Sequence, residues 1–325
     1  MTEQAIVISA HGGPEELRLE DVEVGDPAAG EVRVRHHAIG INFADTYFRT
    51  GLYPTSLPTG IGVEAAGVVE AVGSGVEFVV GDRVTYTGSP LGAYSTARVM
   101  PADSLVRIPD GVGFDATASL TMRGLTAGYL LRRIWPLQEG DTVLFHAAAG
   151  GVGLVFCQWA RLLGVRVIGT ASTEQKADIA RQHGCSEVII GEADVVGRVR
   201  ELTEGRGVKV AYDGVGRDTF DTSIRCLARR GLMVCLGTAS GPVRPVDTPE
   251  LVRRGSLFLT RPALADYLAD PIERDQLVSE LFGHVAEGRI LATVNHRYAL
   301  ADAPAAHRAL ESRSTTGSSI FDLTI

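Results

Sequence analysis

A strand, a loop of small residues and a helix follow one another in the segment "TVLFHAAAGGVGLVFCQWARLLG", residues 142–164. The apolar start predicts a buried strand, and apolar residues at helical spacing predict a helix over 152–163. The loop has the form AxGxxG, with Ala148 where the dinucleotide-binding fingerprint has its first glycine. The next two glycines let the backbone approach a pyrophosphate, and Gly153 lets the helix pack close to the strand. The residues expected to hold the pyrophosphate are Gly150, Gly151, Val152 and Gly153.

The rest of the chain extends this pattern into an α/β protein whose 325 residues suit two domains. Short segments separated by frequent glycines in the first third predict a compact, barrel-like β domain, and a helical period begins near residue 115. Strands and helices then alternate, which predicts a doubly wound parallel sheet. The strands expected after the glycine loop span 165–170, 187–190, 208–213, 232–237 and 256–261, and the helices span 175–183, 276–287 and 301–310.

The composition limits which partners the protein can bind and in which compartment it is expected. The net charge of −8, from 31 basic and 39 acidic residues, argues against a broad electrostatic footprint on nucleic acid. No apolar stretch reaches the roughly 20 residues that span a bilayer, and the first residues show no signal-peptide pattern, so we expect no membrane partner. The four cysteines form no CxxC pair, and the apolar neighbours of Cys157 and Cys235 indicate buried thiols, so a reducing, cytoplasmic setting is expected.

The residues after the second strand of the series favour NADPH over NADH. An NAD site has a carboxylate for the ribose 2′-hydroxyl about 20 residues beyond the glycine loop, but the strand in "VIGTASTEQKA" ends without an acid. Ser172 and Lys176 stand there instead, and a hydroxyl and an ammonium suit a 2′-phosphate. We expect Glu174 to serve as a first-turn acid of the following helix.

The side chains that carry most enzyme chemistry form no recognisable constellation. The eight histidines have no HxxxH or HExxH spacing, and we expect His146 to be a packed or capping residue. The sequence has no GxSxG motif, so a hydrolase has no support. The chain shows a site for a hydride carrier but no evident metal site or covalent nucleophile. We therefore expect chemistry that the bound cofactor carries out almost alone.

Seven segments in order along the chain carry a family resemblance. They are "AIGINFADTYFRTGLYP", "GVEAAGVVEAVGSGV", "GDRV", "LFHAAAGGVGLVFCQWARLLG", "YDGVGRDTF", "RRGLMVCLG" and "ESRSTTGSS". Together they resemble the NADPH:quinone oxidoreductases of the zeta-crystallin type, in the medium-chain dehydrogenase/reductase superfamily. The resemblance implies a GroES-like β-barrel catalytic domain over 1–124, a Rossmann domain over 125–263, and a C-terminal return to the catalytic domain over 264–325. It also implies a homodimer in which the last Rossmann strand, near "SLFLTR", extends the sheet across the interface and hides an edge.

Zinc-dependent members of this superfamily look similar, with one informative difference. Their catalytic zinc uses a Cys in a CxxD segment and a His in a GHExxG segment. Here the first position is Asn42 and the second is Val63. The resemblance therefore implies the zinc-free quinone reductases and weakens an alcohol dehydrogenase interpretation.

The resemblance also implies site residues, which we carry over position by position. Asn42, Asp45 and Tyr47 are expected near the nicotinamide, and Tyr53 in the quinone pocket; a packed domain-interface role is the alternative for the two tyrosines. Asn42, Tyr47 and Tyr53 would act as catalytic residues that orient the quinone by hydrogen bonds. The remaining cofactor contacts implied are Thr126, Tyr129, Gly237, Thr238, Ala239, Ser240, Leu259, Arg261, Pro262 and Arg313.

Two positions depart from the family pattern. Relatives often carry a tyrosine after the third strand that contacts the adenosine phosphate, where this chain has Gly191. A serine familiar from "YDSVG" is Gly214 here. Each change removes one side-chain contact, so the preference for NADPH is expected to be weaker than in relatives.

The function expected is NADPH-dependent reduction of quinones, by hydride or electron transfer from the nicotinamide bound in the cleft between the domains. An alkene or enone reductase of the same superfamily is the alternative within enzymes, because it needs the same cofactor geometry and no metal. The alternative outside enzymes is a crystallin-like or AU-rich RNA-binding protein, against which the acidic composition and the absence of aromatic RNA motifs argue.

Overall fold

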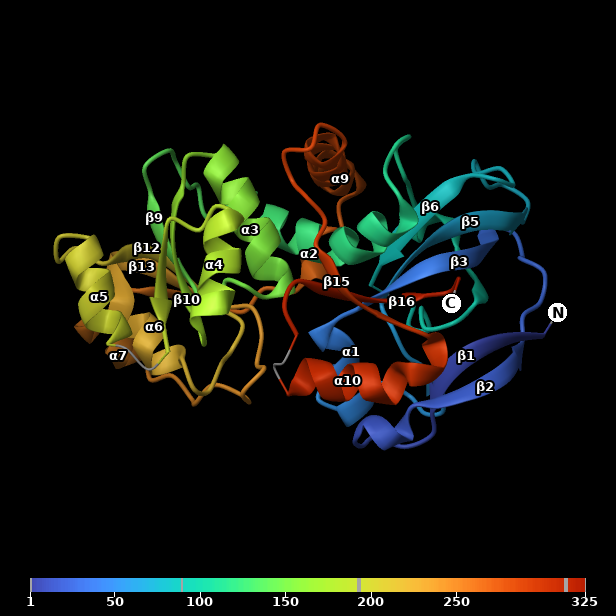
Figure 1. Ribbon diagram of the computed structural model, residues 1–325, viewed down its shortest axis with the longest axis horizontal. Helices are drawn as coiled ribbons and strands as arrows, with labels where there is room; N and C mark the ends of the chain where they lie inside the picture. Colours follow the sequence, from blue (N-terminus) through green and yellow to red (C-terminus); the bar gives the residue numbers. More distant parts are fainter. Residues whose placement is uncertain (1, 89, 192–193, 313–314, 325) are drawn as a thin grey trace. The chain divides into compact units, whose positions relative to one another are not determined.

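The chain forms two compact units, residues 1–125 with 278–325 and residues 126–277, here called the N/C unit and the central unit (Figure 1). The computed structural model describes residues 2–88, 90–191, 194–312 and 315–324. Within these ranges, no helix combines the length and hydropathy that crossing a membrane requires. The three-part division into 1–124, 125–263 and 264–325 stays a prediction.

The central unit contains a six-stranded parallel sheet in the order β11-β10-β9-β12-β13-β14. Its strands are β9 (Thr142–Phe145), β10 (Arg166–Ala171), β11 (Glu187–Ile190), β12 (Val208–Asp213), β13 (Leu227–Cys235) and β14 (Phe258–Thr260). The order reverses beside β9, which is the topological switch point where open α/β sheets bind ligands. The predicted doubly wound parallel sheet is confirmed.

Helices connect these strands and cover the sheet (Figure 1). They are α3 (Gly151–Leu162), α4 (Glu174–Gln182), α5 (Val195–Leu202), α6 (Phe220–Cys226) and α7 (Thr248–Arg253), and the short α8 (Leu264–Tyr267) follows the last strand. A buried apolar cluster that includes Leu144, Ile168 and Phe220 fills the space between sheet and helices. Such burial gives these strands and helices the apolar pattern by which the sequence predicts them.

The N/C unit is built on strands from both ends of the chain, which pair antiparallel except for the parallel pair β15 and β16. One sheet has the order β15-β16-β3-β5-β6-β8, with β7 paired to β3, and a second has the order β2-β1-β4. The strands are β1 (Thr2–Ile8), β2 (Arg18–Glu23), β3 (Glu31–Ile41), β4 (Thr59–Gly60), β5 (Glu64–Val72), β6 (Arg83–Thr87), β7 (Ala97–Pro101), β8 (Val106–Arg107), β15 (Val294–Tyr298) and β16 (Ser318–Asp322). Because β16 pairs with β3, the C-terminal segment completes the sheet that the N-terminal segment begins.

Four helices accompany these sheets, and one of them was not predicted. They are α1 (Phe43–Thr50), α2 (Phe114–Arg132), α9 (Pro271–Ala286) and α10 (Ala303–Glu311), of which α2 and α9 continue into the central unit. The unpredicted helix, α1, directly follows β3 and carries the residues expected near the nicotinamide.

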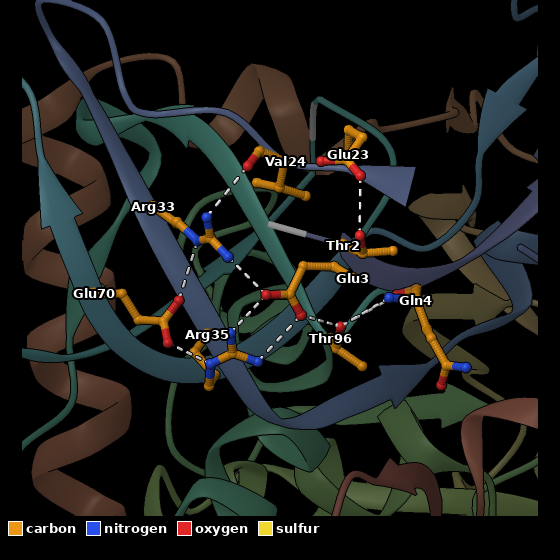
Figure 2. Close-up of polar contacts among 9 residues, drawn as sticks. All are labelled: Thr2, Glu3, Gln4, Glu23, Val24, Arg33, Arg35, Glu70 and Thr96. Atoms are coloured by element: carbon orange, nitrogen blue, oxygen red, sulfur yellow. Dashed lines mark hydrogen bonds and ion pairs between the residues drawn. The ribbon is translucent and has the colours of Figure 1, made fainter. Parts of the chain in front are cut away.

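A partly buried ion network joins β1 to the larger sheet (Figure 2). Glu3 on β1 accepts hydrogen bonds of 2.6 Å from both Arg33 and Arg35 on β3. Both arginines also contact Glu70 on β5, and the Thr96 hydroxyl donates to Glu3 at 2.6 Å. Glu3 is 8% exposed and Arg33 is 2% exposed, so each of these charges depends on its partners.

Candidate functional site

The glycine loop lies between β9 and α3, as predicted. Gly150 is the N-terminal cap of α3 in an extended conformation, and the first intrahelical bond runs from the Leu154 N–H to the Gly150 carbonyl at 2.9 Å. The N–H groups of 151–153 precede that bond, so the helix itself offers them no acceptor. A Cβ on Gly153 would lie 2.6–2.8 Å from the backbone of Ala148, which shows why a glycine is needed there.

Ala148 replaces a fingerprint glycine because a neighbouring strand has room for its methyl group. The Ala148 N–H donates to the Thr170 carbonyl of β10 at 3.0 Å. A Cβ on Gly169, one residue earlier in β10, would lie 2.6 Å from the Ala148 Cβ. The methyl group of Ala148, in the loop after β9, therefore lies where Gly169 of β10 has no side chain.

His146 is packed at the end of β9 beside this loop. Its Nδ1 lies 3.1 Å from the Thr170 hydroxyl, which also accepts from the Ala147 N–H at 3.2 Å. Its Nε2 is buried and has no hydrogen-bond partner among the described residues. Burial lowers the pKa of His146, so the ring is neutral at pH 7. The orphaned nitrogen and the N–H groups at the start of α3 fit a bound polar group such as a pyrophosphate.

The end of β10 displays the residues expected to bind a 2′-phosphate. Ser172 is exposed and directly follows the strand, and Lys176 lies half-buried in the first turn of α4. Thr173 caps that helix by accepting from the Lys176 N–H at 3.3 Å. Glu174 is paired with Arg181 at 2.8 Å, consistent with a first-turn helix acid. The described end of β10 thus presents a hydroxyl and an ammonium, with the nearest acid engaged elsewhere.

Gly191 directly follows β11 next to this strand end. Its φ is +68°, and its N–H donates to the Ala171 carbonyl at 2.9 Å. A Cβ there would meet no atom within 4 Å. The space is open, but the left-handed backbone favours glycine.

Two further strand ends are held together by side chains. Asp213, at the end of β12, accepts from the Val215 and Gly216 N–H groups at 2.9 Å each, and from the Ser223 hydroxyl at 2.6 Å. Ser240 accepts from the Asp218 N–H at 3.0 Å and donates to the Val215 carbonyl at 2.8 Å. The segment expected at the ribose, 237–240, is therefore fixed against the loop after β12, where Gly214 supplies backbone alone.

The remaining expected cofactor residues of the central unit lie on or directly after β14 and on α2. Arg261 follows β14, and its Nη1 lies 3.3 Å from the Cys235 carbonyl of β13. Tyr129 is 3% exposed and stacks on Tyr267 with ring centroids 4.4 Å apart. Leu259 is exposed, Pro262 is half-buried and Thr126 is 9% exposed. Arg313 lies outside the described residues.

In the N/C unit, Asn42 caps α1 and lies beside a buried carboxylate. Its side-chain Nδ2 donates to Glu64 Oε2 of β5 at 2.8 Å. Glu64 Oε1 accepts from the Met122 N–H of α2 at 2.6 Å, and Glu64 is 0% exposed. Arg123, also buried, donates to the Ile41 carbonyl at 2.5 Å. Asn42 is thus held at the point where β3, β5 and α2 meet.

Asp45 is a second buried carboxylate in this region. Its Oδ2 accepts from the Asn42 N–H at 2.7 Å and from the Tyr94 hydroxyl at 2.8 Å. Burial raises the pKa of Asp45 to about 7, while these two donors oppose the rise. Burial likewise raises the pKa of Glu64 to about 6, against the attraction of Arg123. The two carboxylates therefore titrate near neutral pH.

Tyr47 and Tyr53 lie together beside α1. Their rings meet edge to face with centroids 5.2 Å apart, and the Tyr53 N–H donates to the Tyr47 carbonyl at 3.0 Å. Both are half-buried. The arrangement is compatible with packing and with an accessible hydroxyl, so their role stays a prediction.

Sequence reasoning missed the buried partners of these residues. Glu64 stands in "GVEAAG" and Arg123 in "TMRGLT", each a lone charge among small or apolar residues. That isolation is a signal of a paired buried charge. Tyr94 and His307 carry no such signal, because 213 positions separate them in the chain.

Comparison with known proteins shows which family the chain belongs to. A model of the alcohol dehydrogenase GroES-like domain matches residues 28–110, and a model described as zinc-binding dehydrogenase matches residues 151–264. A quinone oxidoreductase from Pseudomonas aeruginosa is 51% identical over 97% of this chain and 98% of its own. The chain belongs to the quinone oxidoreductase family.

A second quinone oxidoreductase and a related reductase are similar over nearly the whole chain. The crystal structure of Escherichia coli quinone oxidoreductase complexed with NADPH matches with a TM-score of 0.96 at 47% identity, covering 98% of this chain and 99% of that one. A 2-haloacrylate reductase from a Burkholderia species is 45% identical over 98% of both chains. The expected GroES-like and Rossmann parts are both present.

The zinc-binding name of the second family model has no counterpart in the described side chains. At the two positions of the zinc ligands, Asn42 bonds to Glu64 and Val63 is buried. In the described ranges, no three His, Cys, Asp or Glu side chains form a group able to hold a metal ion.

Proposed function

We propose that the protein reduces quinones with NADPH. The observation that carries the proposal is one edge of the parallel sheet, where the AxGxxG loop follows β9 and where Ser172 and Lys176 follow the neighbouring strand β10. That edge offers N–H groups to a pyrophosphate and positive charge to a 2′-phosphate. The quinone is supported by a relative of that name at 51% identity and by the Escherichia coli enzyme crystallised with NADPH.

Different residues would bind the cofactor and orient the quinone. When bound, NADPH supplies a hydride equivalent, which with one proton from solvent converts a quinone into a hydroquinone. The loop 150–153 would bind the pyrophosphate, and Ser172 with Lys176 the 2′-phosphate. Asn42, Tyr47 and Tyr53 would orient the quinone, and Asp45 would hold the cap of α1. The residues proposed to border ribose and nicotinamide are Thr126, Tyr129, Gly237 to Ser240, Leu259, Arg261, Pro262 and Arg313.

Oxidation of NADPH and of NADH should be compared across benzoquinones, naphthoquinones and enones, before and after exhaustive chelation. We expect NADPH oxidation with quinones that survives chelation, because the proposed chemistry uses no metal. Oxidation of alcohols that chelators abolish would overturn the proposal.

A reductase of activated alkenes is the second candidate. The 2-haloacrylate reductase at 45% identity supports it, because that substrate is an alkene conjugated to a carboxylate. The same panel separates the two candidates: a higher kcat/KM for enones or 2-haloacrylates than for quinones would favour the alkene reductase.

We also propose a homodimer formed through β14, because β14 ends the described sheet order and pairs with β13 on one side. A location in the cytoplasm is a separate proposal. The four cysteines, all buried and free, are compatible with a reducing compartment.

A further inference from the structure

A chain of buried hydrogen bonds closes around α1 in the N/C unit. Arg49, in the last turn of α1, has its Nη1 3.1 Å from His307 Nδ1 on α10. His307 Nε2 lies 3.1 Å from the Tyr94 hydroxyl, and Tyr94 donates at 2.8 Å to Asp45 in the first turn of α1. We call these four residues, Arg49, His307, Tyr94 and Asp45, the α1 clamp.

Chemistry fixes the direction of every hydrogen in the clamp. A guanidinium only donates, so the neutral His307 accepts at Nδ1 and carries its hydrogen on Nε2. Burial lowers the pKa of His307 to about 3, which keeps the ring neutral. The Nε2–H therefore donates to Tyr94, whose own hydrogen goes to Asp45. The clamp is a one-way chain from a permanent cation to a carboxylate.

The four members are sealed from solvent. Arg49 is 1% exposed, and Tyr94, His307 and Asp45 are each 0% exposed. Arg49 is anchored to Glu311 of α10 by bonds of 2.7 and 3.1 Å. The second oxygen of Asp45 is buried without a hydrogen-bond partner in the described ranges, so Tyr94 and the Asn42 N–H are the two donors to this carboxylate there. Loss of the Tyr94 hydroxyl is therefore costly for the charged form.

The clamp ends at the residues proposed to meet the substrate. Asp45 holds the N–H of Asn42, and Asn42 in turn donates to Glu64. Tyr47 lies on α1, and Tyr53 bonds to the end of that helix. A shift of α1 would move all three side chains together.

We propose that Tyr94 and His307 are positioning residues that fix α1, and through it Asn42, for the reduction. This inference rests on the proposed function and adds two residues that touch neither cofactor nor quinone. They act through Asp45 and Arg49.

The same unit supplies a matched control for a Tyr94 variant. Tyr86 is 2% exposed, and its hydroxyl lies 3.0 Å from Nε2 of the buried His36. Tyr94→Phe and Tyr86→Phe each remove one buried hydroxyl bonded to one buried histidine, and only the first touches α1. In both, the ring stays, so the packing of Tyr94 against Phe321 is kept.

The test compares Y94F, Y86F, H307Q and H307L in the full-length protein. For Y94F we expect kcat/KM for a quinone to fall about tenfold more than for Y86F, at a similar loss of Tm. The acid limb of its pH profile should move to higher pH, because the ionised Asp45 loses a donor while Glu64, Arg123 and the Asn42 N–H still face it. H307Q keeps a donor and an acceptor and should resemble the wild type, whereas H307L should resemble Y94F.

Hydrogen exchange of the amides of 43–50 separates failure of this inference from failure of the proposed function. Faster exchange there in Y94F than in Y86F is expected whatever the substrate is. Equal exchange in the two variants, or equal kcat/KM with unmoved pH profiles, would overturn the positioning role. A wild type that reduces neither quinones nor enones would overturn the proposed function, while the exchange result would still decide on the clamp.

Discussion

Gly153 illustrates how a single missing methyl group shapes the dinucleotide loop. We expect Gly153→Ala to destabilise the central unit by about 1–3 kcal/mol, because the new Cβ would lie 2.6–2.8 Å from the Ala148 backbone. It should also weaken NADPH binding, since the start of α3 must shift. Thermal unfolding and titration calorimetry with NADPH measure the two effects.

Gly283 provides the control for this change. It lies within α9 with no atom within 4 Å of an added Cβ, so Gly283→Ala should stabilise by up to about 1 kcal/mol through helix propensity. If G153A binds NADPH as tightly as G283A does, the close packing of helix and loop does not matter for the cofactor.

Lys176 and Ser172 decide, in our proposal, which nicotinamide cofactor is used. We expect the pair of changes Ser172→Ala and Lys176→Gln to raise the Kd for NADPH at least tenfold and leave the Kd for NADH nearly unchanged, since charge-assisted hydrogen bonds contribute about 1.5–3 kcal/mol. Fluorescence titration of both cofactors measures this. Lys209→Gln is the control, because Lys209 is paired with Asp141 at 2.8 Å near the opposite end of the strands. Equal weakening of both cofactors would show that these residues do not read the 2′-phosphate.

At the scale of elements, the partly buried network of Figure 2 joins β1 to β3. Glu3→Gln should destabilise the fold by about 3 kcal/mol at pH 7, because it leaves Arg33 buried with a weakened partner. Hydrogen bonding to Arg35 lowers the pKa of Glu3 to about 2. The ionised Glu3 carboxylate therefore contributes its full stabilisation above the ordinary pKa of about 4.5, and this stabilisation is lost as the pH falls towards 2. The stabilities of the wild type and the variant should converge in that window.

Glu23→Gln is the matched change for this prediction. Glu23 lies on β2 and accepts from the Thr2 hydroxyl in an exposed position. Its effect on Tm should be small at every pH. A Tm difference between E3Q and wild type that does not shrink below pH 4.5 would contradict the assigned role of Glu3.

Elements with a strong local pattern could be predicted from the sequence. The helix expected over 152–163 is α3 (Gly151–Leu162), and the strand expected over 208–213 is β12. A buried parallel strand is apolar along its length, so its pattern is visible without knowledge of its partners. The strand expected over 232–237 begins earlier, at Leu227, because α6 passes directly into β13.

Elements that depend on distant pairing could not be predicted in this way. β2 has the sequence RLEDVE and is mostly exposed, and β15 and β16 exist through their contact with each other and with β3. The candidate site likewise has a part that the local sequence predicts and a part that depends on distant contacts. The glycine loop and the end of β10 are local motifs, whereas Asn42, Glu64 and Arg123 meet only because β3, β5 and α2 are brought together.

At the scale of the whole molecule, both ends of the chain build one unit and the middle builds the other. The polar side chains proposed to orient the quinone, Asn42, Tyr47 and Tyr53, belong to the N/C unit, and the expected phosphate contacts belong to the central unit. A variant can therefore separate cofactor binding from turnover. Asn42→Ala should lower kcat for quinones while the Kd for NADPH changes less than it does in the Lys176 variant; a large rise in Kd with unchanged kcat would contradict this division.

The proposed dimer depends on β14, which ends the described sheet. Phe258 on this strand is 52% exposed although its ring meets Trp135 edge to face, and an apolar edge strand of this kind favours pairing with a second copy. Phe258→Glu should shift the protein from dimer to monomer at micromolar concentration, because the two new carboxylates would lie close together across a twofold interface. Light scattering after gel filtration measures the mass. Val252→Glu, on α7 and 69% exposed, adds the same charge away from the strand and should leave the dimer intact. A monomeric wild type, or an F258E variant that stays dimeric, would rule out assembly through this edge.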